Sequence, residues 1–589
     1  MLYCIHIAVA ARNDRRAESM LRLFETTHVR MQTELNGTQW FFSSPIKTIQ
    51  NVCVPSCWET YPGMERYRGT CTYCTTFIGG GNLRLIFKGV SFQTNVYLDN
   101  QPLGSHSNAY TPFDFIILKA SQGEHTLRVD VSNEFSEESA LHIPNDYRSW
   151  GGITRGVMVE TLADAYIRSV QAIPFQKDGI WHAAISAGIQ NLSDSQLDAQ
   201  VSVYLAGECM RLEIGLLSPH ERKEIHITIA CPQAQTYELS LPKLFELRAV
   251  LESNGVILDD LIDRIGFRTI QVSGKRILYN DRPISIRGFN RHESHGLYGC
   301  ALPLSAMATD MQIIKDLNAN AIRTSHYPND ELFLDLCDEQ GILVWEEAHA
   351  RGLNLSRMRH PLFQSQSLEG IQAMIQSHIN HPSIFIWGCL NECQSNSDFG
   401  KECYTEQFNA MRQLDSSRPI TSASCYPRSD VVGLSLSAFQ PSEPGIHDGD
   451  ICLGLQDIIS FNMYPLWYTD IDPTSQIMRL REWINTTGNN NKPLIISEIG
   501  AGAIAGFHSA AHDKWSEERQ ADILEQAIRA VFDDPEISGV FIWQFCDCLV
   551  DENWALSRPK TLNNKGVVDE YRRPKMSYNT VKRLFGEYS

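Results

Sequence analysis

Acidic side chains follow directly after short apolar runs at several places in the C-terminal half of the chain. These residues are Glu346, Glu347, Glu392, Glu498 and Asp547. Two carboxylates facing one another can cleave a glycosidic bond, because one protonates the leaving oxygen while the other attacks the anomeric carbon or activates water. The structural alternative is a salt-bridged residue at the rim of a sheet, and we expect it to explain one or two of these places.

Aromatic side chains lie near the ends of the same runs: Trp387, Tyr464, Trp467, Tyr468 and Trp543. An aromatic ring offers a flat apolar face on which a sugar can stack, although each ring alone is more often part of a core. Together with the carboxylates, these rings favour a carbohydrate substrate.

The runs that carry these residues begin after Phe267 and alternate with amphipathic helical stretches. Eight such units within about 320 residues predict a parallel (β/α)8 TIM barrel, whose functional groups gather at the C-terminal ends of the strands. Strands four and seven lie three steps apart around the ring, so Glu392 and Glu498 are expected to converge over its mouth. The predicted strands are 284–289, 321–325, 342–346, 384–390, 419–423, 458–463, 494–498 and 540–545.

The residues before Phe267 predict two β-sandwiches. Short alternating segments such as 83–88 and 126–131 indicate an antiparallel sandwich. Residues 166–266 have the length and strand pattern of an immunoglobulin-like β-sandwich. The predicted domains are 31–162, 163–268 and 269–589, preceded by an extension, 1–30, of uncertain order.

Composition limits the classes of partner. The 589 residues carry a net charge of −18, which disfavours binding to nucleic acid or to an anionic membrane surface. No run of 18 apolar residues predicts a membrane span. The 16 scattered cysteines are typical of free thiols in a reducing compartment, so we expect a cytoplasmic protein.

Several motifs resemble those of glycoside hydrolase family 2. The longest is NAIRTSHYPNDELFLDLCDEQGILVW at 320–345. GFNRHES at 288–294, HPSIFIWGCLNE at 381–392 and PLIISEIG at 493–500 also match. VPSCW at 54–58 and WGGITRGV at 150–157 are similar to the family's N-terminal sugar-binding domain, a jelly-roll-like β-sandwich.

Within this family the resemblance is closest to β-glucuronidases, because SEIGAGAIAGFHS is followed by WSEERQ at 515–520. The resemblance implies a retaining mechanism, in which Glu392 is the general acid/base and Glu498 is the nucleophile. It also implies that Asn391 binds the sugar 2-hydroxyl. Arg323 is expected to brace the strand-two motif, with a structural salt bridge as the alternative. The other substrate-binding residues that the resemblance implies are Asp146, His292, His326, Asn462, Tyr464, Tyr468 and Trp543.

Asn563-Asn564-Lys565 resembles the Asn-x-Lys element with which β-glucuronidases bind the sugar carboxylate. An ammonium and an amide donor satisfy a carboxylate, whereas a neutral hydroxymethyl group would leave the ammonium without its partner. Arg558 would assist, although it lies one residue further from Asn563 than the family pattern predicts. A solvated loop lysine is the alternative interpretation of Lys565.

Two positions leave the substrate open. Met463 and Pro465 stand where glucuronidases are expected to have Arg and Tyr, and such changes can alter which epimer at C4 is accepted. We therefore expect a β-D-glucuronidase, with a β-galacturonidase or a dual β-hexuronidase as alternatives. A β-galactosidase of the same family and a carbohydrate-binding protein without activity are further alternatives; the first predicts that Lys565 is dispensable.

No metal or cofactor is expected. Cys53, Cys57, Cys71 and Cys74 have spacings that suggest zinc, but their segments read as strands, and strand residues three apart point to opposite faces. The expected partner is a small-molecule glycoside, and a homo-oligomer is expected because family members commonly associate.

Overall fold

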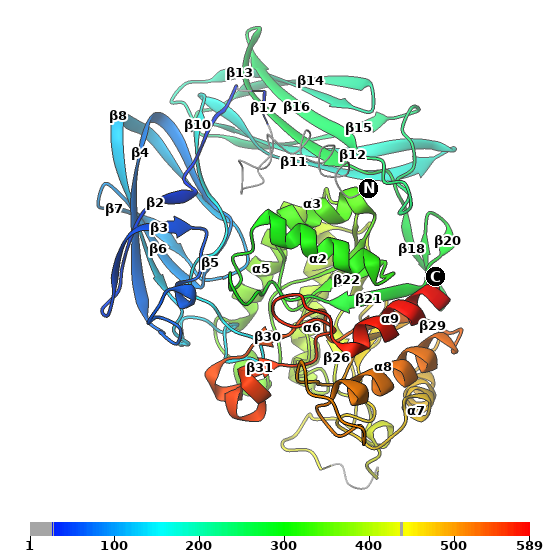
Figure 1. Ribbon diagram of the computed structural model, residues 1–589. Helices are drawn as coiled ribbons and strands as arrows, with labels where there is room; N and C mark the ends of the chain where they lie inside the picture. Colours follow the sequence, from blue (N-terminus) through cyan, green and yellow to red (C-terminus); the bar gives the residue numbers. More distant parts are fainter. Residues whose placement is uncertain (1–25, 28, 436–439) are drawn as a thin grey trace, which may run out of the picture.

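The computed structural model describes residues 26, 27, 29–435 and 440–589. Most of the predicted extension 1–30 lies outside this range. The β-sheets fall into three groups along the chain (Figure 1). Each group has a hydrophobic core of its own.

The first group is an eight-stranded antiparallel sheet that curves around a core containing Trp40, Tyr73 and Phe87. In β4, buried side chains alternate with half-buried or exposed ones from Cys71 to Ile78, as expected for a sheet with one face on the core. The strands are β1 (Met31–Glu34), β2 (Gly37–Ser43), β3 (Thr48–Val54), β4 (Thr70–Phe87), β6 (Gln93–Leu98), β7 (Gln101–His106), β8 (Phe113–Ser132) and β10 (Val157–Leu162).

The second group consists of a three-stranded sheet and a four-stranded sheet that share one core. In β15, Ile225, Ile227 and Ile229 are buried while their neighbours are exposed, so one face of this sheet covers the core. The two sheets are β11 (Ala165–Lys177), β12 (Ile180–Asn191) and β15 (Arg222–Ala230), and β13 (Leu197–Leu205), β14 (Glu208–Leu217), β16 (Phe245–Ser253) and β17 (Val256–Ile265).

The third group is the barrel. A small sheet formed by β18 (Ile270–Ser273), β19 (Arg276–Tyr279) and β20 (Arg282–Pro283) precedes it. Residues Ile270, Ile277 and Tyr279 of this small sheet share a hydrophobic cluster with barrel residues such as Phe541. The small sheet therefore closes one end of the barrel.

The barrel strands are parallel and run in the order predicted, except that the fifth strand is divided at Ser422 into two short segments. Because β25 and β26 are two parts of one strand, the sheet closes into a ring. The barrel strands are β21 (Ile286–Asn290), β22 (Ala321–Thr324), β23 (Leu343–Glu347), β24 (Ile384–Gly388), β25 (Ile420–Thr421), β26 (Ala423–Ser424), β27 (Ile459–Asn462), β28 (Leu494–Ile499) and β29 (Ile537–Ile542).

Helices cover the outside of the ring, and several begin at a side-chain cap. Asp330 caps α3, Ser397 caps α6, Asp472 caps α7 and Ser516 caps α8. Helix α3 is capped at its C-terminus by Gly341, which has φ +69° and leaves no room for a Cβ beside the carbonyl of Leu239. The helices are α2 (Leu304–Asp316), α3 (Glu331–Gln340), α4 (Leu355–Met358), α5 (Phe363–His378), α6 (Asp398–Leu414), α7 (Pro473–Thr486), α8 (Glu517–Phe532) and α9 (Met576–Glu587).

The predicted fold class is thus confirmed: antiparallel β-sheet domains precede a TIM barrel. The domain boundaries at 162/163 and 268/269 stay our proposal, and the separate cores support them.

Candidate active site

Glu498 lies in β28, and Glu392 lies four residues beyond β24. Glu392 has φ +51°, a left-handed conformation that non-glycine residues rarely adopt and that is concentrated at functional sites. Its backbone N–H donates to the carbonyl of Ala423 in the neighbouring strand segment β26. The backbone around Glu392 is therefore held in a strained conformation by the strand next to it.

Glu498 is buried and is held by two side chains. Nη1 of Arg323 donates to its Oε1 at 2.9 Å, and the hydroxyl of Tyr464 donates to its Oε2 at 2.5 Å. Arg323 itself is fully buried, and it also pairs with Glu347, whose Oε2 lies 2.7 Å from Nη2. Arg323 thus fixes the position of Glu498 and favours its charged form.

Two asparagines connect the carboxylates. Nη2 of Arg323 donates to Oδ1 of Asn391 at 2.7 Å, and Nδ2 of Asn462 donates to the same oxygen at 3.2 Å. Nδ2 of Asn462 also donates to Oε1 of Glu392 at 3.0 Å. Glu392 and Glu498 therefore belong to one hydrogen-bonded network over the barrel mouth, as their strand positions predict.

The charge of Glu392 affects the titration of Glu498. Burial, and then the negative charge of Glu392, raise the pKa of Glu498 to about 8, while Arg323 and Tyr464 oppose this shift. A carboxyl group with such a pKa beside a second carboxylate means that the pair carries one proton near neutral pH. One proton shared by two carboxyl groups is what general acid catalysis by one and nucleophilic attack by the other require.

His292, His326 and Trp543 form one wall of the site. The His326 and Trp543 rings stack with centroids 5.1 Å apart, and His292 meets Trp543 edge-on at 5.3 Å. Burial lowers the pKa of His292 to about 3 and keeps the pKa of His326 well below its usual range, so both rings are neutral. Nδ1 of His326 lies 2.9 Å from Glu347, which leaves Nε2 to face Glu498 at 3.8 Å.

Asp146 reaches this site from the first domain and meets three side chains of the barrel. Its carboxylate lies 3.1 Å from Arg351 and 3.3 Å from Arg558, and Nδ2 of Asn563 donates to it at 3.1 Å. Although burial opposes the shift, the charges of Arg351, Lys565 and Arg558 lower the pKa of Asp146, which is therefore ionised.

Arg351 is a site residue that the sequence analysis missed. Its Nη2 also lies 3.4 Å from Oε2 of Glu392. The sequence signal available was its position shortly after the predicted third strand, where barrel sites lie. Arg558, which lies one residue further from Asn563 than the family pattern predicts, belongs to the same cluster through its ion pair with Asp146.

Lys565 is 3% exposed, and no carboxylate among the described residues forms an ion pair with its ammonium. Its Nζ lies 5.6 Å from the ring centroid of Tyr464 and 5.4 Å from that of Tyr468. Burial opposes a fall in the pKa of Tyr468, but the Lys565 charge lowers it. The alternative interpretation of Lys565 as a solvated loop lysine is therefore wrong, because this ammonium is enclosed.

Several buried polar atoms of the site have no hydrogen-bond partner in the described part of the protein. They are Nε2 of His292, Nε2 of His326, Nδ2 of Asn391, Nε of Arg558 and Oδ1 of Asn563. Buried polar atoms without partners are rare and costly in native proteins, so such a group at one place indicates a polar ligand. The amide of Asn563 donates to Asp146, so its free atom is an acceptor.

Other carboxylates and aromatic rings from the sequence analysis serve the framework. Glu346 bonds His378, and Asp547 pairs with Lys575. The indole of Trp387 donates to Asp415, and Trp467 packs against Trp515. Glu346 and Asp547 are therefore the salt-bridged residues that we expected at one or two of these places.

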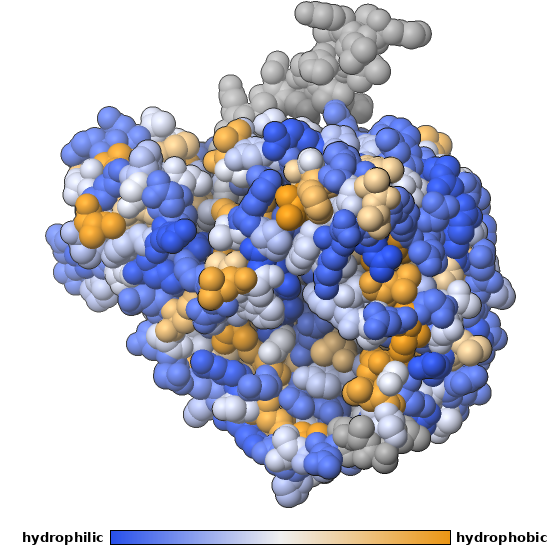
Figure 2. All heavy atoms as spheres, turned by 60° about the horizontal axis from the view of Figure 1, so that its bottom comes forward, coloured by the Kyte–Doolittle hydropathy of each residue, from blue (hydrophilic) through white to orange (hydrophobic). Residues whose placement is uncertain are grey.

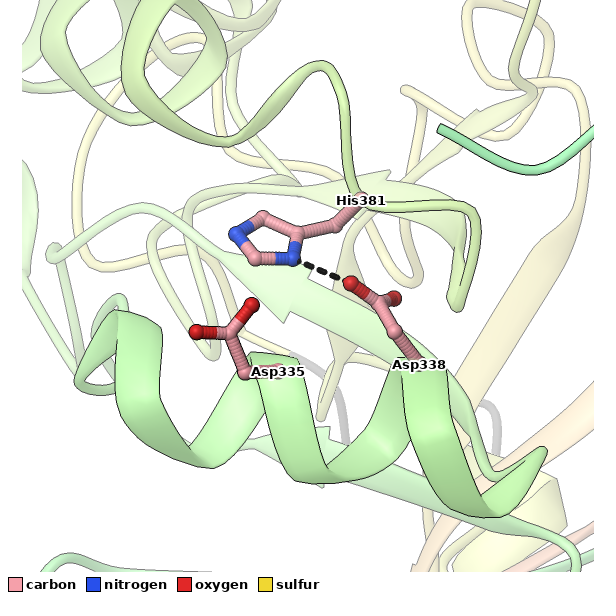
Figure 3. Close-up of side chains that lie close together, drawn as sticks. All are labelled: Asp335, Asp338 and His381. Carbon is pink, nitrogen blue, oxygen red and sulfur yellow. Dashed lines mark hydrogen bonds and ion pairs between the residues drawn. The ribbon is translucent and has the colours of Figure 1, made fainter. Parts of the chain in front are cut away.

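The structure offers one group of possible metal ligands within the described ranges: Asp335, Asp338 and His381 (Figure 3). Protein groups already engage it, because Nδ1 of His381 lies 2.6 Å from Asp338 and Arg264 lies 2.9 Å from Asp335. We therefore assign it no metal. Of the cysteines considered for zinc, Cys71 and Cys74 lie three residues apart on β4. Cys71 is buried and Cys74 is half-buried, as expected for residues on opposite faces of a strand.

Figure 2 turns the lower side of Figure 1 toward the viewer. On this face, apolar side chains lie in small separate groups among polar ones. No helix in the described part of the chain is long and apolar enough to span a membrane.

A buried carboxylate pair over a TIM barrel mouth, with a polar network and stacked rings, is the arrangement of a glycosidase. The sequence profile "Glycosyl hydrolases family 2, TIM barrel domain" matches residues 270–588. The chain therefore belongs to glycosyl hydrolase family 2.

The relatives include uronidases. One relative of known structure is a β-galacturonidase from Eisenbergiella tayi, crystallised with galacturonate, whose sequence is 46% identical to this chain. The two structures match with a TM-score of 0.91 over 96% of this chain and 99% of that one. A β-glucuronidase from Streptococcus agalactiae is 25% identical over 85% of this chain and 84% of its own length. A putative β-glucuronidase from Formosa agariphila is 26% identical, and this chain spans 62% of it.

Proposed function

We propose that the protein is a retaining exo-β-D-hexuronidase that prefers β-D-galacturonides. The observation that supports a uronide substrate is the buried ammonium of Lys565, which has no carboxylate partner among the described residues. This ammonium lies next to Tyr464, whose hydroxyl donates to Glu498. A buried ammonium without a counterion is costly, and the C6 carboxylate of a uronide would supply one. Arg558, with an unpartnered Nε, is the second donor we assign to this carboxylate.

In the proposed first step, Glu498 attacks the anomeric carbon while Glu392 gives its proton to the glycosidic oxygen. The bond between C1 and that oxygen breaks, the aglycone leaves as an alcohol, and the sugar is esterified to Glu498. In the second step Glu392 takes a proton from water, whose oxygen attacks C1, and Glu498 leaves as a carboxylate. Arg323 and Tyr464 stabilise the charge of Glu498 when it is released.

We assign the binding of sugar hydroxyls to the neutral and acidic side chains around the carboxylate pair. Nδ2 of Asn391 donates to the 2-hydroxyl, where a bond that strengthens in the transition state assists catalysis. Asp146, ionised and held by Arg351, accepts from hydroxyls on the far side of the sugar. His292 and His326 each offer an unpartnered Nε2 to a sugar hydroxyl, and Trp543 supplies an apolar surface.

Galacturonide takes precedence over glucuronide because the relative with 46% identity over nearly the whole chain is a β-galacturonidase. Glucuronide is the second candidate, because β-glucuronidases are related over most of the chain at lower identity.

The test is to measure kcat/KM on p-nitrophenyl β-D-galacturonide, β-D-glucuronide and β-D-galactoside under one set of conditions. We expect the order galacturonide, then glucuronide, then galactoside. A preference for the galactoside would refute the role of Lys565, and a preference for the glucuronide would reverse the epimer while leaving the uronide assignment intact.

A further inference from the structure

The backbone around Lys565 is fixed by buried groups that belong to other segments. The N–H of Gln544 donates to the carbonyl of Lys565 at 2.9 Å, and its side-chain Nε2 donates to the carbonyl of Asn563 at 3.1 Å. A Cβ on Gly566 would lie 2.3 Å from the backbone N of Asp547, so only glycine allows this approach. The segment that carries Lys565 thus lies directly on the chain that follows β29.

A buried ion pair lies at the centre of this contact. Nζ of Lys575 is 2.7 Å from Oδ1 of Asp547, and each side chain is 1% exposed. The same Asp547 oxygen accepts from the N–H of Gly566 at 2.8 Å, while Nζ of Lys575 donates to the carbonyl of Asn564 at 3.0 Å. The pair therefore binds the backbone of the residue before Lys565 and of the residue after it.

Lys575 also ties this contact to the segment after β28. Its Nζ donates to the carbonyl of Ala503 at 2.8 Å, and the N–H of Ala503 donates to the carbonyl of Asn564 at 2.8 Å. The β28 strand carries Glu498, so one ammonium connects the loop after the nucleophile strand with the loop of Lys565.

We propose that Asp547 and Lys575 are positioning residues for substrate selectivity: they fix the place of the Lys565 ammonium relative to Glu498. This inference rests on the proposed uronide function. Among the described residues, Asp547 and Lys575 bond one another and the backbone of Ala503, Asn564 and Gly566, and neither bonds Glu392, Glu498 or the Lys565 ammonium, so both act through the backbone. Removing one partner of a buried pair is costly, whereas replacing both by neutral groups is often tolerated, so stability alone does not require the charges.

Displacement of a recognising charge affects a charged substrate more than a neutral one. A uronide loses its counterion when Lys565 moves, but a galactoside has no carboxylate to lose. If the Asp547–Lys575 pair only stabilised the barrel, its removal would reduce the hydrolysis of both substrates alike. The ratio of the two kcat/KM values therefore separates positioning from general support.

The test compares three variants with the wild-type protein: Lys575→Met, Asp547→Asn, and the charge-neutral double variant Asp547→Asn/Lys575→Met. The measured quantities are KM and kcat on p-nitrophenyl β-D-galacturonide and β-D-galactoside, together with Tm. For the folded variants we expect kcat/KM on the galacturonide to fall about 10- to 100-fold, mostly through KM, because a small displacement of a positioned group has effects of this size. We expect kcat/KM on the galactoside to change less than about threefold, in the range of an uncoupled position.

The matched control is the double variant Asp415→Asn/Arg418→Met. This pair is also buried, with 2.6 Å between its charged atoms, but it bonds β24 and the segment before it, through the carbonyls of Ile379 and Ile384 and the indole of Trp387, and not the Lys565 segment. This control variant should lower Tm without changing the ratio of kcat/KM on the galacturonide to kcat/KM on the galactoside. The inference is overturned if the Asp547 and Lys575 variants keep the wild-type ratio, or if the control changes it equally. If the wild-type protein itself shows no preference for the uronide, the proposed function fails first.

Discussion

Nη2 of Arg351 lies 3.4 Å from Oε2 of Glu392 and thereby connects the proposed acid/base to the first domain. The same nitrogen lies 3.1 Å from Oδ1 of Asp146, a residue of the segment before β10. Arg351 thus bridges a barrel carboxylate and a carboxylate that the sandwich domain supplies. The active site is complete only when both domains are in place, and this dependence gives the first prediction.

Arg351→Met should lower kcat/KM on the uronide about 10- to 100-fold, because both carboxylates lose a charged partner. Among the charges that lower the pKa of Asp146 against the effect of burial, Arg351 contributes most, so the variant should raise that pKa. The acid limb of the pH profile of kcat/KM should then move to higher pH. Arg359→Met, an exposed change on the same loop, is the control and should leave the profile unchanged.

The roles of the two glutamates can be separated by azide rescue. In Glu498→Gly the nucleophile is missing, so azide should attack C1 directly and yield the α-glycosyl azide. In Glu392→Gly the glycosyl-enzyme still forms from an activated aryl glycoside, and azide should yield the β-product. We expect losses of kcat of about 10²-fold or more without azide in both variants. A β-glycosyl azide from Glu498→Gly together with an α-glycosyl azide from Glu392→Gly would exchange the assignments.

The carboxylate pair predicts a basic limb in the pH profile. Burial, and secondarily the charge of Glu392, raise the pKa of Glu498 to about 8, so the pair keeps its single proton below that pH and loses it above. Because the mechanism needs that proton, kcat/KM should fall as pH rises through about 8. The hydroxyl of Tyr464 lowers this pKa, so Tyr464→Phe should move the limb to higher pH. A limb that moves downward in this variant would contradict the assignment.

Lys565→Met should abolish the preference for uronides. The loss of transition-state binding on the galacturonide should be about 2–5 kcal/mol, since a buried charged contact is removed. Hydrolysis of the galactoside should be nearly unchanged. Lys560→Met removes an exposed lysine from the same loop and should have no effect on either substrate. Equal effects of the two variants would mean that general charge, and not a specific contact, attracts the uronide.

Asp551 holds the segment that presents Asp146, and its loss should destabilise the contact between the domains. Its carboxylate accepts from the N–H groups of Asn145 and Ser149 and pairs with Arg68 at 2.5 Å. Asp551→Ala should lower the free energy of unfolding of this contact by about 2–4 kcal/mol, because it leaves buried donors without an acceptor. Differential scanning calorimetry checks this value.

The neighbouring Glu552→Ala serves as the control for Asp551→Ala. The side chain of Glu552 is 42% exposed, so its pairs with Arg68 and Arg148 are screened by water. We expect a change of less than about 1 kcal/mol. A control effect as large as that of Asp551→Ala would show that any acidic residue in this loop has the same role.

The alternation of apolar strands with amphipathic helices was enough to predict the barrel, because burial on both faces and a right-handed crossover leave few other solutions. The positions of Glu392 and Glu498 at strand ends followed from the same pattern. The fifth strand was predicted as continuous, but it is broken at Ser422, since a two-residue segment on each side of a break has no periodicity to read.

The sequence by itself determined the family, the barrel and the two candidate glutamates, since local apolar patterns and contiguous motifs specify them. Only the tertiary structure decided which charges meet. Arg351 and Asp146 are separated by 205 positions, and the ion pair between them depends on how two domains pack. Likewise, Asp547 looks like a catalytic carboxylate along the chain, but Lys575 neutralises it in space. A charge acts through distance and burial, and a linear sequence states neither of these across separate segments.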